Sequence, residues 1–133
     1  KAVTTDGIFA CSARYVARAY QTARLPARLY RFDQAAALVL VPGLGVFHAA
    51  ELAFVWGVGG GLLGDESTAP ALGTAMPRYW PRSAAAGHPG GDPAWPLWAP
   101  MADSRLRLAA TIAVEPANPD GRCDFWSTIY DTL

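Results

Sequence analysis

Apolar and small side chains recur at helical spacing over residues 6–24, with arginines on the opposite face. This pattern predicts an amphipathic helix. Thr4, Thr5 or Asp6 is expected to cap its first turn, and Pro26 ends it because proline lacks the N–H that a helix interior needs. The positions that set the period are Ile8, Phe9, Ser12, Val16, Ala19 and Ala23.

A short strand is predicted over residues 28–32, where arginines and aromatic side chains alternate around Leu29. A helix followed by a strand is typical of α/β proteins. Asp33 comes directly after this strand, at the edge where α/β enzymes place functional groups. Its carboxylate is a candidate to orient His48. An acidic residue is equally common in a turn after a strand, and this is the preferred interpretation.

The rest of the chain alternates between helical periods and segments rich in glycine and proline. Residues 34–46 are expected to form a loop, and residues 48–56 a helix that the following glycines end. A second helix over 69–86 is expected to be disturbed by Pro77 and Pro81. A surface loop anchored by tryptophans follows over 88–100, then an edge strand or extended segment over 105–114 and a short helix over 125–133.

The charge balance excludes several classes of partner. Eleven basic and eleven acidic side chains cancel in the 133 residues, so the net charge gives no reason to expect binding to nucleic acid. The longest apolar runs are interrupted and fall short of the roughly 20 residues that span a bilayer. No leader sequence is recognisable after Lys1, and we expect the natural N-terminus to lie upstream.

Two groups of side chains are candidates for chemistry. Cys11 and Cys123 are too far apart for a short metal or redox motif, which leaves a disulfide or two unrelated thiols. His48 ends a loop in apolar surroundings, where it is either a core residue or a general base. Glu51 shares its helix face, but one histidine and one glutamate are too few for a zinc site, and we expect no metal or cofactor.

The chain contains no G-x-S-x-G elbow, so it offers no activated serine of its own. Several segments, in order, nevertheless resemble the end of type-B carboxylesterases and cholinesterases. The most specific is Gly-x-x-His-x-x-Glu at positions 45–51, followed by Phe-Val-Trp-Gly at 54–57. The others are Thr-Asp-Gly-Ile-Phe-Ala-Cys at 5–11, Leu-Tyr-Arg-Phe at 29–32, Arg-Tyr-Trp-Pro-Arg at 78–82, Trp-Pro-Leu-Trp at 95–98 and Cys-Asp-Phe-Trp at 123–126.

The resemblance implies an α/β-hydrolase fold, of which residues 1–133 form the C-terminal part: the last strands of a doubly wound, mostly parallel sheet and their flanking helices. It implies that His48 is the catalytic base of a carboxylic-ester hydrolase and that Glu51 supports the active site. The other two members of the catalytic triad are then expected upstream of this chain. The nucleophilic serine comes first, the acid (Glu or Asp) second, and the histidine last. The expected partners are a small-molecule ester and the remainder of the hydrolase domain, and this chain by itself is expected to be inactive.

The same resemblance implies a disulfide between Cys11 and Cys123, and hence a secreted or otherwise extracytoplasmic protein. Ala49 departs from the family, which usually has glycine after the histidine, and a methyl group there is expected to bear on substrate fit. The alternative function is a non-catalytic, cholinesterase-like adhesion or scaffold module. An intact upstream serine elbow would distinguish the two.

Overall fold

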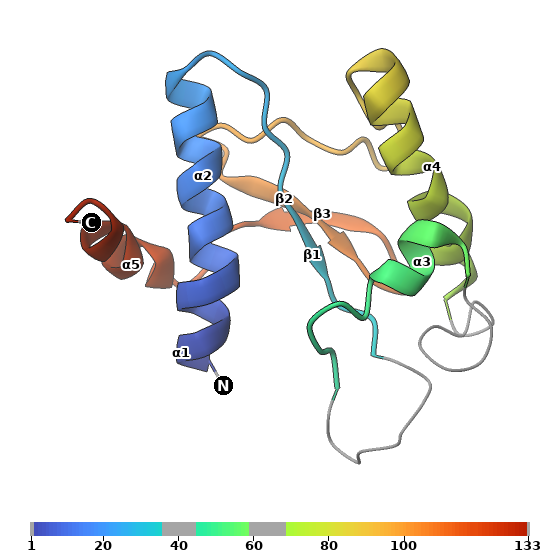
Figure 1. Cartoon of the computed structure of the whole chain (residues 1–133), viewed down its shortest axis with the longest axis horizontal. Coiled ribbons are helices and arrows are strands. Elements are labelled where there is room, and N and C mark those ends of the chain that lie inside the picture. The colour runs from blue at the N-terminus through green and yellow to red at the C-terminus, as the bar shows by residue number, and fades with distance from the viewer. Residues whose placement is uncertain (1, 36–44, 59–68, 133) are drawn as a thin grey trace. The chain divides into compact units, whose positions relative to one another are not determined.

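The computed structural model describes residues 2–35, 45–58 and 69–132. The chain divides into two compact units (Figure 1). Unit 1 comprises Lys1–Leu29, Pro96–Arg105 and Val114–Leu133, and unit 2 comprises Tyr30–Trp95 and Leu106–Ala113. Each unit is therefore assembled from segments that are distant in the sequence.

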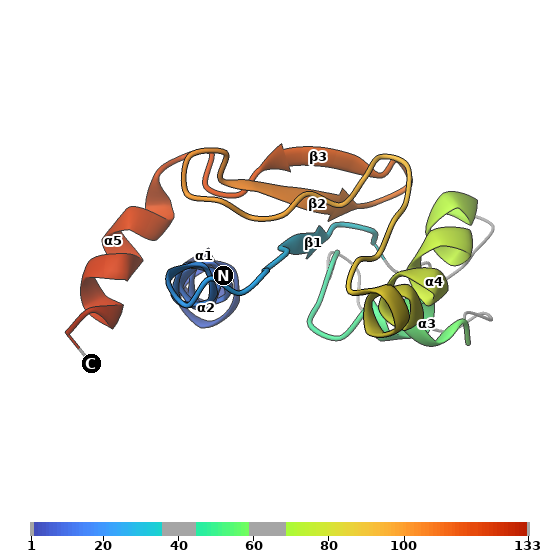
Figure 2. The same cartoon turned by 90° about the horizontal axis from the view of Figure 1, so that it is seen from above.

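The N-terminal helix of unit 1 is longer than predicted. Its three parts, α1 (Ala2–Thr4), the π-helical η1 (Thr5–Ala10) and α2 (Cys11–Thr22), follow one another as a single rod (Figures 1 and 2). Thr4 has helical φ and ψ angles and makes no side-chain capping bond, so the predicted cap at this position is wrong. The helix ends at Thr22, with Ala23 as its C-cap, before Pro26 as expected.

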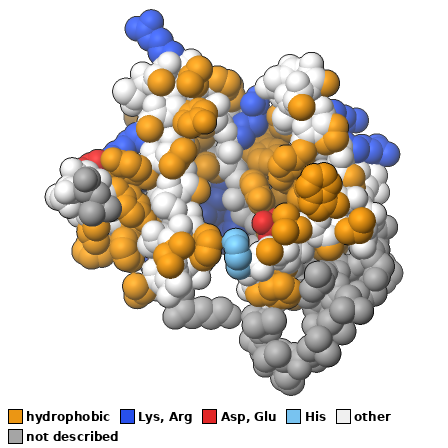
Figure 3. Space-filling model, viewed as in Figure 1, with side chains coloured by type: hydrophobic (Ala, Val, Ile, Leu, Met, Phe, Trp, Pro, Cys, Tyr) orange, Lys and Arg blue, Asp and Glu red, His pale blue; other side chains and the backbone are white. Residues whose placement is uncertain are grey.

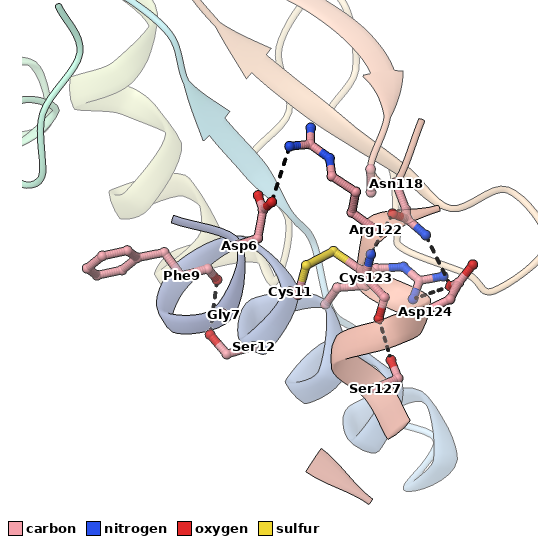
Figure 4. The surroundings of a disulfide bond; sticks show 12 residues. Asp6, Gly7, Phe9, Cys11, Ser12, Asn118, Arg122, Cys123, Asp124 and Ser127 are labelled. Carbon is pink, nitrogen blue, oxygen red and sulfur yellow. Dashed lines mark hydrogen bonds and ion pairs between the residues drawn. A yellow bond between two sulfur atoms is a disulfide. The ribbon is translucent and has the colours of Figure 1, made fainter. Parts of the chain in front are cut away.

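Helix α5 (Arg122–Tyr130) packs beside this rod, and the Cys11–Cys123 disulfide joins the two (Figure 4). Both cysteines are buried. The Tyr130 hydroxyl donates a hydrogen bond to the Gly7 carbonyl oxygen at 2.5 Å. A side-chain carbon at Gly7 would meet the ring of Trp126 at 2.6 Å, so close packing of α5 requires glycine here. The disulfide expected from the resemblance is present.

The strands form a mixed three-stranded sheet in the order β1-β2-β3. Strand β1 (Tyr30–Phe32) runs parallel to β2 (Ser104–Leu108), with Tyr30 opposite Leu106, and β3 is Ala113–Pro116. We predicted one extended segment over 105–114, but the structure has two strands separated by a bend. The bend contains no glycine or proline, which left it without a signal in the sequence.

The apolar core of unit 2 lies between helices α3 (Leu52–Trp56) and α4 (Pro70–Ala86) and strand β2. Helix α4 is continuous through Pro77 and Pro81, so the prolines do not break the helix predicted at this position. Gly87 ends it in the left-handed conformation, with φ of 72°. The buried core side chains are Phe54, Ala69, Leu72, Met76, Tyr79, Leu106 and Leu108.

The predicted tryptophan-anchored loop is confirmed. Residues 87–103 contain no helix or strand, and Trp95 packs edge-on against Tyr79 at a centroid distance of 5.4 Å and against Tyr30 at 5.6 Å. Trp98 is buried in unit 1. Most of the predicted loop over 34–46 lies outside the described residues, as do the glycines at 59–61 and 64. Among the described helices, none has the length and apolar character to cross a bilayer.

Candidate active site

His48 lies in a turn that precedes α3, rather than in the helix itself as the sequence predicted. The turn is closed by hydrogen bonds from the Ala50 N–H to the Phe47 carbonyl and from the Leu52 N–H to the Ala49 carbonyl, both at 3.2 Å. Ala49 interrupts the helix because its φ is +70°, in the left-handed region. Ala50 is only 1% exposed and anchors the turn, whereas His48 is exposed.

Glu51 is half-buried and directly precedes α3. Its negative charge acts on Tyr30, at the start of β1. Partial burial, and secondly this charge, raise the pKa of the Tyr30 phenol above its ordinary value. The sequence placed Tyr30 on a strand but gave no sign of its proximity to Glu51, because the two residues are brought together by tertiary folding.

The ring of Tyr30 is held by aromatic neighbours within unit 2. It meets Trp80 at a centroid distance of 5.7 Å and Trp95 at 5.6 Å, both edge-on, which is a favourable geometry for aromatic pairs. Helix α4 and the tryptophan loop therefore fix the side chain that lies near Glu51. Sequence reasoning did not single out Tyr30.

Asp33 extends the β1 ladder instead of forming a turn. Its N–H donates to the Leu108 carbonyl at 2.8 Å. Its carboxylate pairs with the guanidinium groups of Arg31 at 2.5 Å and Arg107 at 3.5 Å. Asp33 is therefore not the turn residue that we predicted, and its carboxylate is paired with two arginines instead.

Metal binding has no visible basis in the part of the chain that the structure describes. No group of three or more His, Cys, Asp or Glu side chains is arranged there to hold an ion. His88 is exposed just beyond α4, and the two cysteines are joined in the disulfide. The candidate site considered below is the turn that holds His48, with Glu51 three residues further along the chain.

No family model and no curated protein matches this chain. Among solved structures it is similar to the carboxylesterase EST55 of Geobacillus stearothermophilus, with a TM-score of 0.62 and 27% sequence identity. This chain resembles part of a carboxylesterase. The match covers 83% of this chain and 23% of that esterase, so the chain spans about a quarter of its length.

The likeness supports the expected fold at a coarse level. Helices around a small mixed sheet are consistent with a piece of an α/β-hydrolase. It also supports a relationship to ester hydrolases. The roles of His48 and Glu51 stay predictions, because neither the likeness nor the geometry tests them.

Proposed function

We propose that this chain carries the catalytic histidine of a carboxylic-ester hydrolase, His48. The observation that supports it most is the similarity, over 83% of the chain, to a carboxylesterase. The local geometry is compatible with the role, since the turn before α3 holds the imidazole exposed on a backbone anchored by buried Ala50. A general base must be accessible to the proton that it abstracts.

In the proposed mechanism, His48 removes the proton from a serine hydroxyl as its oxygen attacks the ester carbonyl. The imidazolium returns that proton to the leaving alcohol, and an acyl-enzyme forms. His48 then takes a proton from water as the water oxygen attacks the acyl group, and it gives this proton to the serine oxygen as the bond to the acyl group breaks and the acid is released. The serine, the triad acid and the oxyanion-hole amides are proposed to lie outside these 133 residues.

Glu51 has a supporting role in this proposal. It lies three residues from His48, is half-buried and carries a charge that reaches Tyr30. We assign it electrostatic support and no proton transfer.

The proposed setting is extracytoplasmic. The structure contains the Cys11–Cys123 disulfide, and such bonds persist mainly in oxidising compartments. We propose on this basis that the protein is secreted or otherwise exported.

The test is p-nitrophenyl acetate hydrolysis by the longer polypeptide that includes the residues encoded upstream of Lys1. His48→Ala should lower kcat/KM by about 10³-fold or more, as expected when a triad base is lost. His88→Ala is the matched control and should retain nearly full activity, since His88 lies exposed beyond α4. If the longer polypeptide without substitutions is inactive, a non-catalytic adhesion-type module is favoured. If its His48→Ala variant is as active as the unsubstituted polypeptide, a different residue is the base.

A further inference from the structure

The π-helix η1 leaves one backbone carbonyl without its usual helical donor. In an α-helix the Cys11 N–H would donate to the Gly7 carbonyl, four residues back. In this structure it donates to the Asp6 carbonyl, five residues back. The Gly7 carbonyl accepts a hydrogen bond from the Tyr130 hydroxyl of α5 instead, at 2.5 Å. Helix α5 thus supplies a donor to the carbonyl that the π register releases.

The packing of α5 also depends on the register of this segment. Gly7 lies against the ring of Trp126, where a side-chain carbon would come within 2.6 Å. Rewinding the segment with α-helical bonds would rotate the residues before Cys11 by one position, about 100° around the axis. Asp6 or Ile8 would then face Trp126, and the space there admits neither side chain. The α-helical register and a docked α5 therefore exclude each other.

Helix α5 has few buried groups that attach it to the rod. Of its nine residues, all of which the structure describes, only Cys123 is buried. Hydrophobic side chains are visible on the surface over α5, and Phe125 is 63% exposed (Figure 3). The Arg122–Asp6 ion pair, at 3.2 Å, is open to solvent at the arginine and contributes little (Figure 4). The bond from Cys123 to Cys11 is therefore the main attachment.

We propose that the oxidation state of Cys11 and Cys123 sets the helical register of residues 5–10. With the disulfide intact, α5 is docked and the segment is π-helical. Reduction by a dithiol breaks the S–S bond and yields two thiols, while the dithiol is itself oxidised to a disulfide. Helix α5 then undocks, and the Gly7 carbonyl takes the Cys11 N–H as its donor. The segment rewinds because the α-helix is the ordinary register and the π-helix a rare one.

This arrangement is a two-state device, since each register fits only one position of α5. It lies wholly within unit 1, which contains both η1 and α5. The proposal goes beyond the esterase function and does not rest on the catalytic role of His48.

Gly7→Ala tests the register because its effect should differ between the two states. In the oxidised protein the added carbon meets Trp126, and the Tm should fall by about 4 °C or more. In the Cys11→Ser, Cys123→Ser variant it should leave the Tm unchanged or raise it, because alanine favours an α-helix over glycine. Thermal unfolding is measured on the longer polypeptide that includes the residues upstream of Lys1.

Tyr130→Phe keeps the test decisive if Gly7→Ala prevents folding of the oxidised protein. It should lower the Tm of the oxidised protein by about 2 °C or more, because the Gly7 carbonyl loses its donor. It should have no effect in the double serine variant. Ser83→Ala is the matched control. It removes a hydroxyl that donates to the Tyr79 carbonyl at 2.8 Å in unit 2, so its effect should be equal in both backgrounds.

A Tm loss for Tyr130→Phe that is equal in both backgrounds would show that the π register persists without the disulfide, and would overturn the proposal. The same holds for Gly7→Ala. A double serine variant without a cooperative thermal transition would also overturn it, because the device requires a folded form in which the two cysteines are not joined.

Discussion

At the scale of single residues, the departure at position 49 has a structural meaning that the sequence comparison did not give. Ala49 adopts a φ of +70°, a conformation that glycine reaches without steric cost and alanine does not. The family's usual glycine thus fits the backbone better than the alanine found here. We interpreted the methyl group as bearing on substrate fit, and the structure adds a direct effect on the turn that holds His48.

Ala49→Gly should therefore raise the free energy of unfolding by up to about 1 kcal/mol. Relief of the strain at position 49 stabilises the folded state, and the greater conformational entropy of glycine in the unfolded chain offsets part of this gain. Ala50→Gly is the control, because Ala50 is 1% exposed and should lose about 1 kcal/mol or more. Urea unfolding of the two variants gives both values. Equal destabilisation by both substitutions would show that the left-handed turn is not strained.

At the scale of elements, Asp103 connects parts of unit 1 that are distant in the sequence. Its carboxylate accepts hydrogen bonds from Arg14 on α2 at 3.0 Å and from the indole N–H of Trp98 at 2.8 Å. Its carbonyl accepts one from the Ala117 N–H at 2.6 Å. Its φ of 36° is unusual for a residue with a side chain. Nothing in the local sequence pattern identified this residue.

Asp103→Ala should lower the free energy of unfolding by about 2–3 kcal/mol, since it leaves the largely buried Arg14 and Trp98 donors without this acceptor. Asp103→Asn should cost less, about 1 kcal/mol, because an amide oxygen still accepts a hydrogen bond and asparagine tolerates positive φ. Thermal or urea unfolding measures both. A loss below about 0.5 kcal/mol for the alanine variant would contradict the connecting role.

The helices were predictable because their signals are local, whereas tertiary relationships were not. The periodicity over 6–24 predicted most of the long rod, and the tryptophan loop followed from its prolines and glycines. The division of residues 105–114 into two strands depends on pairing and had no local signal. The candidate site shows the same limit: the motif singled out His48 and Glu51, but Tyr30 reaches Glu51 only through the fold.

At the scale of the whole molecule, the disulfide ties the two ends of the chain together. Cys11 and Cys123 are separated by 112 residues, and both lie in unit 1. In the chain-entropy model, closing so long a loop stabilises the folded state by about 4–5 kcal/mol. The disulfide thus restricts the conformations that the intervening residues, including the turn of His48, can adopt in the unfolded state.

The Cys11→Ser, Cys123→Ser double variant should accordingly lose a large part of that stability, about 2–5 kcal/mol. Urea unfolding of the oxidised chain, the chain with reductant and the double variant provides the comparison. Reductant should destabilise the natural chain and leave the double variant unchanged. Three identical unfolding curves would mean that the bond contributes nothing to folding.

In the proposed reaction the imidazole of His48 transfers protons during ester hydrolysis. Chemical rescue tests it most directly: imidazole is added to the inactive His48→Ala variant of the longer polypeptide, and p-nitrophenyl acetate turnover is followed. We expect saturable recovery of activity, beyond the hydrolysis that imidazole catalyses in buffer, because the small molecule occupies the vacated space and acts as the base. A folded His48→Ala variant that is inactive and stays so at every imidazole concentration would contradict it.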